Sequence, residues 1–545
     1  MDQDSISQDD SFEQELRSQA WHDAVQDGNL DQIEKLLESG TDVNTSSQGL
    51  PGIIQSVING NIEVVQFLIE KGVNVNQLES YNGNAGGWTA LHYAAESGNM
   101  NLVRLLLENG ADPTQADISG MTPYDSAKIQ RLKSDYRELL RLLKSKGGRP
   151  GRENLILVTG AGFTKGLFGD APLVIDNFRV KEDLLPKYAQ FAIARTILEA
   201  ELNQQKFEDE QRYKDGLDRG NVNLERLMTR LNSGMPYDNS QDTLVRRALL
   251  TDLRQQFVQR IHKMRRNTQA HHHLKLFALQ CFSTNRAVLT FNYDDLMDEA
   301  FFRASNKERD QSWDWHPNNG YGFQCRDARV TIGFSNDMRG KGSPVILKLH
   351  GSINWKVRAG ATPPYRVEDF VHHIENWNDR NLSLHQKLGS EGIVSNINRI
   401  YYEEQIEQHL EPDPFIVPPV LTKSELTEQP LLRLIWSQAS DFLRQADKVI
   451  FVGYSLPITD IASVTMFRES LSDLYPDLLE IEVVDYKNEN DLIGRDKLKE
   501  AYRQIFHGLP DEAFQFDGAA AWLKDFTSRV DPGDLQPTEI ETVSV

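Results

Sequence analysis

The sequence predicts an α/β fold in two parts, a helical repeat array followed by a doubly wound parallel sheet. Three observations lead to this prediction. Glycines recur at near-constant spacing in the first 150 residues. After residue 153, short apolar runs typical of buried strands alternate with helical segments. A mostly helical stretch at about 181–280 separates the first of these strands from the second, which indicates an insertion.

Repeats organise the N-terminal part. The glycines Gly28, Gly60 and Gly98, each followed by Asn, step by 32 and then by 38 positions (60 − 28 and 98 − 60). The segment 88–95 (WTALHYAA) is similar to the Thr-Pro-Leu-His-x-Ala signature of ankyrin repeats, which have a period of about 33 residues. The resemblance implies three repeats and a C-terminal cap over residues 17–147.

Composition and charge limit what the chain does. At 545 residues it is too long for one core. A formal net charge of −21 disfavours binding to nucleic acid or an anionic membrane. Cys281 and Cys325 are the only cysteines, so a four-Cys zinc site is excluded and a reducing cytoplasm is expected. We expect the acidic ends, residues 1–16 and 531–545, to be disordered, and no run approaches the length of a membrane-spanning helix.

Between these ends, residues 148–152 are predicted to form a glycine-rich hinge, and residues 153–530 the sheet domain. Three polar motifs in that domain each follow a predicted buried strand directly. They are GAGFT (160–164) after 155–158, TFNYD (290–294) after 287–289, and LHGS (349–352) after 345–347. Further strands are predicted at 449–452 and 481–484, with a possible one at 329–332. Because parallel sheets bind ligands at their carboxyl edge, we expect one pocket assembled from these motifs.

Each motif has a chemical use and a plainer alternative. Gly160, Ala161 and Gly162 would let the backbone approach a pyrophosphate at a helix N-terminus, although such a turn is often only a tight connection. The Asn292 amide can orient a water or hold ribose hydroxyls, or it can close an Asx turn. An imidazole with its usual pKa of about 6.5 accepts a proton at neutral pH, which suits His350 to a general base; a lone histidine is also often structural.

Together the three motifs resemble the sirtuin-like family, whose pocket holds NAD. GAGFT is similar to the family's Gly-Ala-Gly-x-Ser, with Thr164 in place of serine. TFNYD is similar to Thr-Gln-Asn-x-Asp and keeps Asn292 and Asp294. The resemblance covers about residues 153–505. It implies a Rossmann-like NAD-binding domain in which His350 is the base acting on the nicotinamide ribose.

A later segment, VGYSLP at 452–457, resembles the family's Gly-x-Ser-Leu element. The resemblance implies that Gly453 and Ser455 line the adenosine side of the pocket. Asp485 ends the predicted strand 481–484, where acids of dinucleotide folds accept from a ribose hydroxyl, and a structural role is equally open.

Deacylating sirtuins carry a four-Cys zinc ribbon that two cysteines cannot build. Divergent relatives without the ribbon look like NAD hydrolases of bacterial antiphage defence. The resemblance therefore implies cleavage of NAD, as substrate, to nicotinamide and ADP-ribose, without a bound cofactor or metal. The implied catalytic residues are Asn292 and His350; the implied NAD-binding residues are Gly160, Ala161, Gly162, Thr164, Asp294, Gly453, Ser455 and Asp485.

The ankyrin repeats are expected to regulate the NAD-binding domain, and two other functions stay open. We expect a protein partner or trigger at the ankyrin repeats, and a homo-oligomer, because an uncontrolled NAD hydrolase would be toxic. One alternative is transfer of ADP-ribose, or deacylation, by the same pocket. Another is a non-catalytic sensor of NAD or ADP-ribose, in which the ankyrin repeats are the working part.

Overall fold

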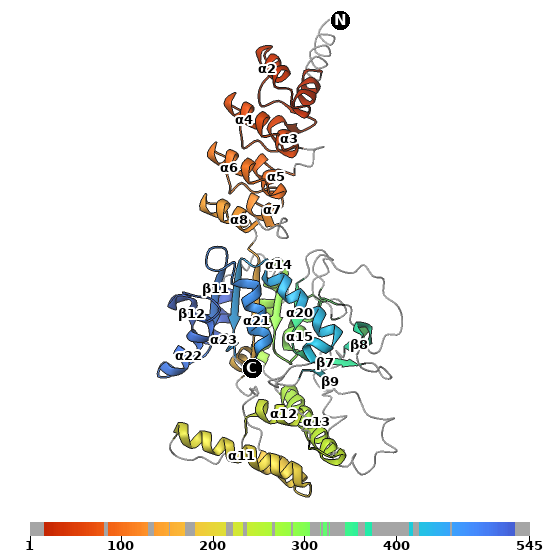
Figure 1. The fold of residues 1–545 in the computed structure, drawn as a ribbon. Helices are drawn as coiled ribbons and strands as arrows, with labels where there is room; N and C mark the ends of the chain where they lie inside the picture. The colour runs from red at the N-terminus through yellow and green to blue at the C-terminus, as the bar shows by residue number, and fades with distance from the viewer. Residues whose placement is uncertain are drawn as a thin grey trace, which may run out of the picture. The chain divides into compact units, whose positions relative to one another are not determined.

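The computed structural model describes most of the chain (Figure 1). The described residues are 16–80, 86–128, 136–151, 153–168, 180–213, 222–232, 237–263, 268–284, 287–305, 315, 317, 320–323, 326–327, 344–357, 366–372, 414–417, 425–457 and 460–528. The chain divides into two compact units, which we call the array unit (residues 1–154 with 474–479) and the sheet unit (residues 155–473 with 480–545). The predicted acidic tail 531–545 and nearly all of the predicted acidic N-terminus lie outside the described residues.

Helix pairs build the array unit. A helix at 16–26 is followed by α2 (Leu30–Glu38), α3 (Gly52–Ile58), α4 (Ile62–Glu70), α5 (Ala90–Ser97), α6 (Met100–Glu108), α7 (Pro123–Lys128) and α8 (Tyr136–Ser145). A short hairpin of β1 (Ser46–Ser47) and β2 (Leu50–Pro51) precedes α3.

The Gly-Asn pairs of the sequence explain how each helix pair is joined. The glycines at 28, 60 and 98 have φ of 68°, 69° and 70°, the left-handed region that glycine enters most easily. The next residue, Asn29, Asn61 or Asn99, caps the second helix, since its side chain accepts from the backbone N–H three positions later. The repeated dipeptide therefore ends one helix and starts the next.

Backbone contacts extend the array unit past its last helix. The N–H of Gly148 donates to Leu143 O (2.9 Å), and the N–H of Gly151 donates to Asp125 Oδ2 (2.8 Å). The carbonyl of Arg149 accepts from Thr122 Oγ1 (2.7 Å). Residues 148–151 of the expected hinge (148–152) are thus hydrogen-bonded to the repeats and do not form a loose linker. Gly148 and Gly151 allow the backbone to come this close to Leu143 and Gly120. Arg152 is outside the described residues.

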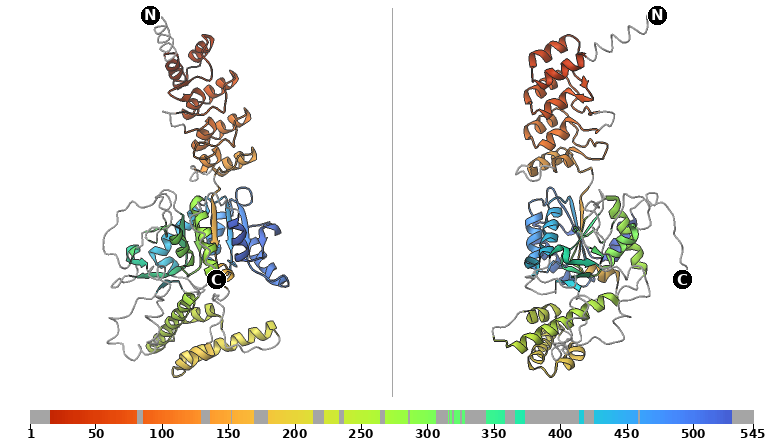
Figure 2. Two further views of the ribbon diagram at one scale, coloured as in Figure 1. Left: turned by 180° about the vertical axis from the view of Figure 1, so that it is seen from behind. Right: turned by 90° about the vertical axis from the view of Figure 1, so that its right-hand side faces the viewer.

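A six-stranded parallel sheet forms the centre of the sheet unit, in the order β12-β11-β10-β3-β4-β6. Its strands are β3 (Leu155–Thr159), β4 (Ala287–Thr290), β6 (Val345–Lys348), β10 (Lys448–Val452), β11 (Glu480–Val484) and β12 (Phe514–Gln515). Figure 2 shows helices on both faces of this sheet. The strand order reverses between β3 and β10, so their connections leave in opposite directions.

The covering helices are α9 (Ala161–Leu167), α14 (Thr268–Thr284), α15 (Leu296–Ser305), α20 (Pro430–Leu443), α21 (Ile461–Leu471), α22 (Leu492–Arg503) and α23 (Ala519–Ser528). α14 packs against α15 and α23, where Phe277 meets Trp522 with ring centroids 6.4 Å apart. α20 packs against α21. Short turns complete the unit at α19 (Glu425–Glu428), η4 (Val367–Asp369) and η5 (Asp511–Ala513). No helix within the described ranges has both the length and the apolar character needed to cross a membrane.

The helical insertion lies where the sequence predicts it, between β3 and β4. It comprises η2 (Val180–Leu184), α10 (Leu185–Tyr188), α11 (Ala192–Tyr213), α12 (Leu224–Asn232) and α13 (Ser240–Lys263) before α14. Ion pairs and a hydrogen bond connect its helices: the buried Glu201 contacts Arg226 (2.6 Å) and Arg230 (3.2 Å), and the neutral Tyr188 donates to Asp252 (2.5 Å).

A second, four-stranded sheet was not predicted. It has the order β5-β8-β7-β9, with β5 (Arg326–Asp327), β7 (Gly351–Val357), β8 (Phe370–His372) and β9 (Pro414–Ile416). β7 begins inside the LHGS motif, so His350 is held between the two sheets. The possible strand at 329–332 lies outside the described residues.

Candidate functional site

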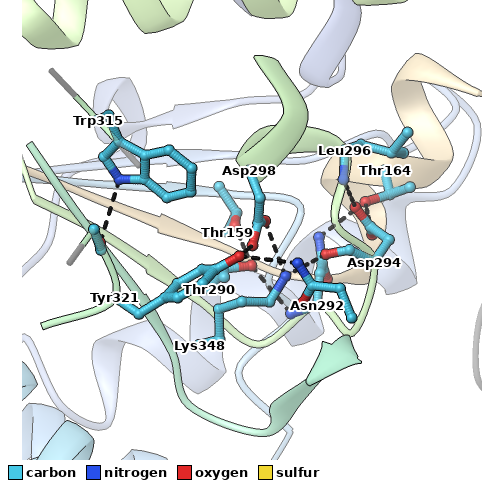
Figure 3. A network of polar contacts seen from close by, with 12 residues as sticks. Thr159, Thr164, Thr290, Asn292, Asp294, Leu296, Asp298, Trp315, Tyr321 and Lys348 are labelled. Atoms are coloured by element: carbon cyan, nitrogen blue, oxygen red, sulfur yellow. Dashed lines mark hydrogen bonds and ion pairs between the residues drawn. The ribbon is translucent and has the colours of Figure 1, made fainter. Parts of the chain in front are cut away.

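A pocket opens at the carboxyl ends of β3 and β4, the edge at which the sequence predicts a site. Figure 3 draws several of its polar lining residues. The space among its lining atoms is about 290 Å³, much of it open to solvent, and the enclosed part is small. Its walls come from β3, α9, α14, β4 and α15. The lining residues are Thr159, Phe163, Thr164, Leu167, Phe168, Leu274, Thr290, Asn292, Asp294, Leu296, Met297 and Asp298.

Three of the predicted site residues form one chain of hydrogen bonds in this pocket. Thr164 Oγ1 donates to Asp294 Oδ2 (2.7 Å), so it accepts from Asn292 Nδ2 (3.0 Å). The direction of both bonds is fixed because a carboxylate only accepts. The Asn292 amide is thereby oriented with its nitrogen toward Thr164. Within the described residues its oxygen has no partner, so it can accept from a ligand hydroxyl or a water.

The strand ends beneath the chain are tied together. Thr159 Oγ1 at the end of β3 donates to Thr290 Oγ1 at the end of β4 (2.8 Å). The same Thr290 oxygen accepts from the backbone N–H of Asn292 (3.1 Å). These bonds set the height of the Asn292 turn above the sheet.

A buried lysine supports the pocket floor, and sequence reasoning missed it. Lys348, the last residue of β6, is fully buried and lies 3.0 Å from the buried carboxylate of Asp298. It also donates to the carbonyl of Asp294. Burial raises the pKa of both carboxyls, Asp294 and Asp298, and the Lys348 charge opposes that rise. The sequence offered one sign of this residue: Lys348 ends a strand whose other residues are apolar, which indicates a buried charge with a partner.

The polar contacts continue from the pocket floor to the second sheet. Tyr321 donates to Asp298 Oδ1 (2.5 Å) and accepts from Asn354 Nδ2 on β7 (3.0 Å). All three side chains are buried. Figure 3 shows Asp298 and Lys348 between Tyr321 and the Asn292 turn, so the floor and the turn form a continuous network.

His350 has different surroundings. Its ring meets Phe291 edge-on (centroids 5.1 Å apart), stacks on Tyr293 (6.0 Å) and lies 6.5 Å from Trp436. Its Nε2 is 3.6 Å from Asp460 Oδ2, and both side chains are buried. His350 does not belong to the lining of the pocket described above. The expectation of one pocket assembled from all three motifs is therefore not met: residues of GAGFT and TFNYD line this pocket, whereas His350 packs against Phe291 and Tyr293, on either side of Asn292.

The two glycine turns pack directly on each other. The N–H of Gly160 donates to Val452 O (3.1 Å) and that of Gly162 to Gly453 O (2.8 Å). A Cβ on Gly160 would lie 2.6 Å from the Gly453 carbonyl oxygen, and one on Gly162 would lie 2.8 Å from Gly453 Cα. Gly453 itself has φ +63°. These glycines are thus required by backbone packing between the β3 and β10 turns, whatever they do for a ligand.

The remaining predicted residues lie around these turns. Ala161 begins α9 and is exposed, and Ser455 is exposed beyond the β10 turn. Asp485 follows β11, is largely buried, accepts from the N–H of Tyr486 (2.8 Å) and pairs with Lys487 (3.2 Å). A ribose hydroxyl would have to share or displace the Lys487 contact.

No group of three metal-ligating side chains occurs among the described residues. The tract 271–273, three histidines in sequence, lies within α14.

Comparison with known proteins identifies the array. Residues 21–117 match the family model of ankyrin repeats in three copies. A human protein described as "tRNA endonuclease ANKZF1" is 43% identical over 56 residues, 10% of this chain and 8% of that protein. A mouse "2-5A-dependent ribonuclease" is 36% identical over 107 residues, 20% of this chain and 10% of the relative. These matches fall in the ankyrin region, and the chain spans a tenth or less of each relative.

Proposed function

We propose that the sheet unit is an NAD hydrolase that cleaves the bond between nicotinamide and ribose. The observation that carries the proposal is the Asn292–Thr164–Asp294 chain in a pocket at the carboxyl edge of a parallel sheet. The strand order, reversing between β3 and β10, has the pattern of dinucleotide-binding Rossmann folds, which hold their ligand at that reversal. The resemblance of the three motifs to the sirtuin-like family gives the reaction class.

In the proposed reaction the N-glycosidic bond of NAD breaks and nicotinamide leaves with the bonding electrons. Positive charge develops on the ribose, as in glycoside cleavage. Water adds to the anomeric carbon and gives up one proton, which yields ADP-ribose. The Asn292 amide oxygen would accept from a ribose hydroxyl or this water, and holding that water in place supplies the entropic part of the catalysis.

His350 would accept the proton. Its ring lies against Phe291 and Tyr293, so a ligand that reaches beyond Asn292 would bring its ribose to the imidazole. The pocket lined by Asn292 is too small to enclose a dinucleotide, so most of the NAD molecule would have to lie along the strand ends toward Gly453 and Asp485.

A second candidate is an NAD or ADP-ribose sensor without turnover. One observation favours it: His350 is outside the lining of the pocket that contains Asn292. The same site could also transfer ADP-ribose or remove acyl groups, if a group other than water attacks the ribose after nicotinamide leaves.

The deciding experiment is incubation of purified protein with NAD, followed by chromatography of the products. Hydrolysis gives equal amounts of nicotinamide and ADP-ribose that depend on Asn292 and His350. Label from NAD retained on protein would indicate transfer instead. Binding by calorimetry with no nicotinamide release would indicate the sensor and refute hydrolysis.

We propose that the ankyrin repeats receive a protein partner or a neighbouring subunit that controls this activity. Such arrays expose extended surfaces for protein binding. A partner changes turnover only if it binds the active and resting states with different affinity. An antiphage-defence role in the cytoplasm, with homo-oligomerisation, is the biological setting that the family resemblance suggests.

A further inference from the structure

Asp460 places a buried carboxylate beside His350 without using it to cap the helix that it starts. It is the N-cap residue of α21, a position where Asp ordinarily accepts from a backbone N–H of the first turn. Its side chain makes no such capping bond. Oδ2 instead lies 3.6 Å from His350 Nε2 and 3.5 Å from the hydroxyl of Tyr454. The Asp460 side chain is 4% exposed, so its charge is little screened.

The other titratable groups around the His350 ring do not compete for this role. Tyr293 stacks on the ring and donates its hydroxyl to the carbonyl of Val417 (2.8 Å). Burial, followed by the Asp460 charge, raises the pKa of Tyr454 well above its usual value, so it stays neutral. Lys348 directs its ammonium to Asp298. Among the described residues facing the imidazole, Asp460 is therefore the charged one.

We propose that Asp460 is the positioning residue of His350: it keeps the proton on Nε2 and stabilises the protonated imidazole. With Nε2–H directed at the carboxylate, the lone pair that takes up a proton is the one on Nδ1. The aromatic rings of Phe291 and Tyr293 fix the ring plane, and Asp460 fixes the tautomer. The catalytic side of this inference rests on the proposed function; the pairing itself does not.

The test measures the protonation of His350 directly in the full-length protein. Histidine C2-hydrogen exchange, read by mass spectrometry of peptides, gives a titration midpoint for each histidine, with the exposed His507 as internal reference. Asp460→Asn should lower the His350 midpoint by about one pH unit or more, because an adjacent opposite charge shifts a titration by that amount. Asp496→Asn removes the same charge from an exposed position on α22 and should leave it unchanged.

Activity provides the second readout. In Asp460→Asn, kcat for NAD cleavage should fall about tenfold or more, with KM nearly unchanged. The acid limb of the pH–rate profile should move to lower pH together with the His350 midpoint. Asp460→Glu keeps the charge, so it should recover part of the lost kcat and part of the shift in the His350 midpoint. Asp460→Ser is the second neutral variant if Asn prevents folding, since Ser also suits an N-cap.

The outcomes separate the two proposals. A lowered His350 midpoint with parallel loss of turnover supports the positioning role. A lowered midpoint in a protein that never cleaves NAD supports the pairing and rejects the proposed function. An unchanged midpoint in folded Asp460→Asn and Asp460→Ser overturns the inference, whatever the activity.

Discussion

Thr164 joins Asn292 to Asp294, and removing its hydroxyl tests the site most sharply. Thr164→Val keeps the branched shape but deletes the group that donates to Asp294 and accepts from Asn292. A bond to an ionised carboxylate contributes about 1.5–3 kcal/mol and a neutral one about 0.5–1.5 kcal/mol. Asp294 is partly exposed, so water replaces some of the loss. We expect a decrease of about 2 kcal/mol in the free energy of unfolding.

Thr164→Ser is the matched control, since it retains both hydrogen bonds and loses only a methyl group. Its expected cost is about 0.8 kcal/mol. The functional difference should be larger than the difference in stability. In the Val variant the Asn292 amide loses its orientation, and a misplacement of about 1 Å reduces turnover about 10²-fold, while Ser should stay near the wild-type rate.

The pH dependence of this effect has a definite sign. Burial raises the folded-state pKa of Asp294, and the hydrogen bond from Thr164 opposes the rise. A raised carboxyl pKa means that the folded state holds the proton more tightly, so its contribution to stability falls as pH rises above the unfolded value of about 4. Without the hydrogen bond from Thr164, the folded-state pKa of Asp294 rises further, so stability decreases more steeply with pH. The loss of unfolding free energy caused by Thr164→Val should therefore be larger at pH 8 than at pH 5.

Urea unfolding, read by pulsed hydrogen exchange on peptides of β3, α9 and β4, separates this effect from the array unit. NAD turnover is measured on the same samples. If Thr164→Val matched Thr164→Ser in both stability and turnover, the hydrogen-bond chain would have no role in either, and the reasoning would be refuted.

Four further outcomes are expected. Asn292→Ala and His350→Ala should each lower NAD cleavage about 10²-fold or more with nearly unchanged melting, and full turnover in either would remove that residue from the mechanism. Cleavage should persist in EDTA; one tightly bound zinc per chain by elemental analysis would contradict this. Burial lowers the pKa of His92, so the unfolded state takes up its proton first, and the protection factors of the α5 amides, corrected for the intrinsic pH dependence of exchange, should decrease as pH falls from 7 to 5; constant protection factors would oppose that. A chain that begins at Arg152 should bind NAD with altered turnover or oligomeric state, and identical mass, rate and response would exclude the array as regulator.

Five of the six strands of the parallel sheet could be predicted because each contains a run of buried apolar residues; β12, which is only Phe514 and Gln515, is too short to show one. The predicted runs lie within β3, β4, β6, β10 and β11, with ends that differ by at most one residue. β7 could not be predicted in this way. Its sequence alternates polar Ser352, Asn354 and Lys356 with apolar residues, a pattern that indicates a half-exposed strand, yet the structure buries these three polar side chains as well.

The site was predicted as a set of motifs but not as a geometry. Thr164, Asn292 and Asp294 meet as expected, because their strands are neighbours in the sheet. Side chains of an extended segment alternate, so Phe291 and Tyr293 turn toward His350 while Asn292 turns toward Thr164. The partners Lys348 and Asp460 depend on contacts between distant segments, which residue spacing does not encode.

The fit between the turns at Gly160–Gly162 and Gly453 limits how this protein can change through evolution. A side chain that clashes with another side chain can be accommodated by a second substitution that makes room. Here the atoms in the way include the main-chain oxygen and Cα of Gly453, which no substitution removes. A genetic screen for second-site suppressors of Gly160→Ala or Gly162→Ala should therefore yield true revertants and no compensating pair.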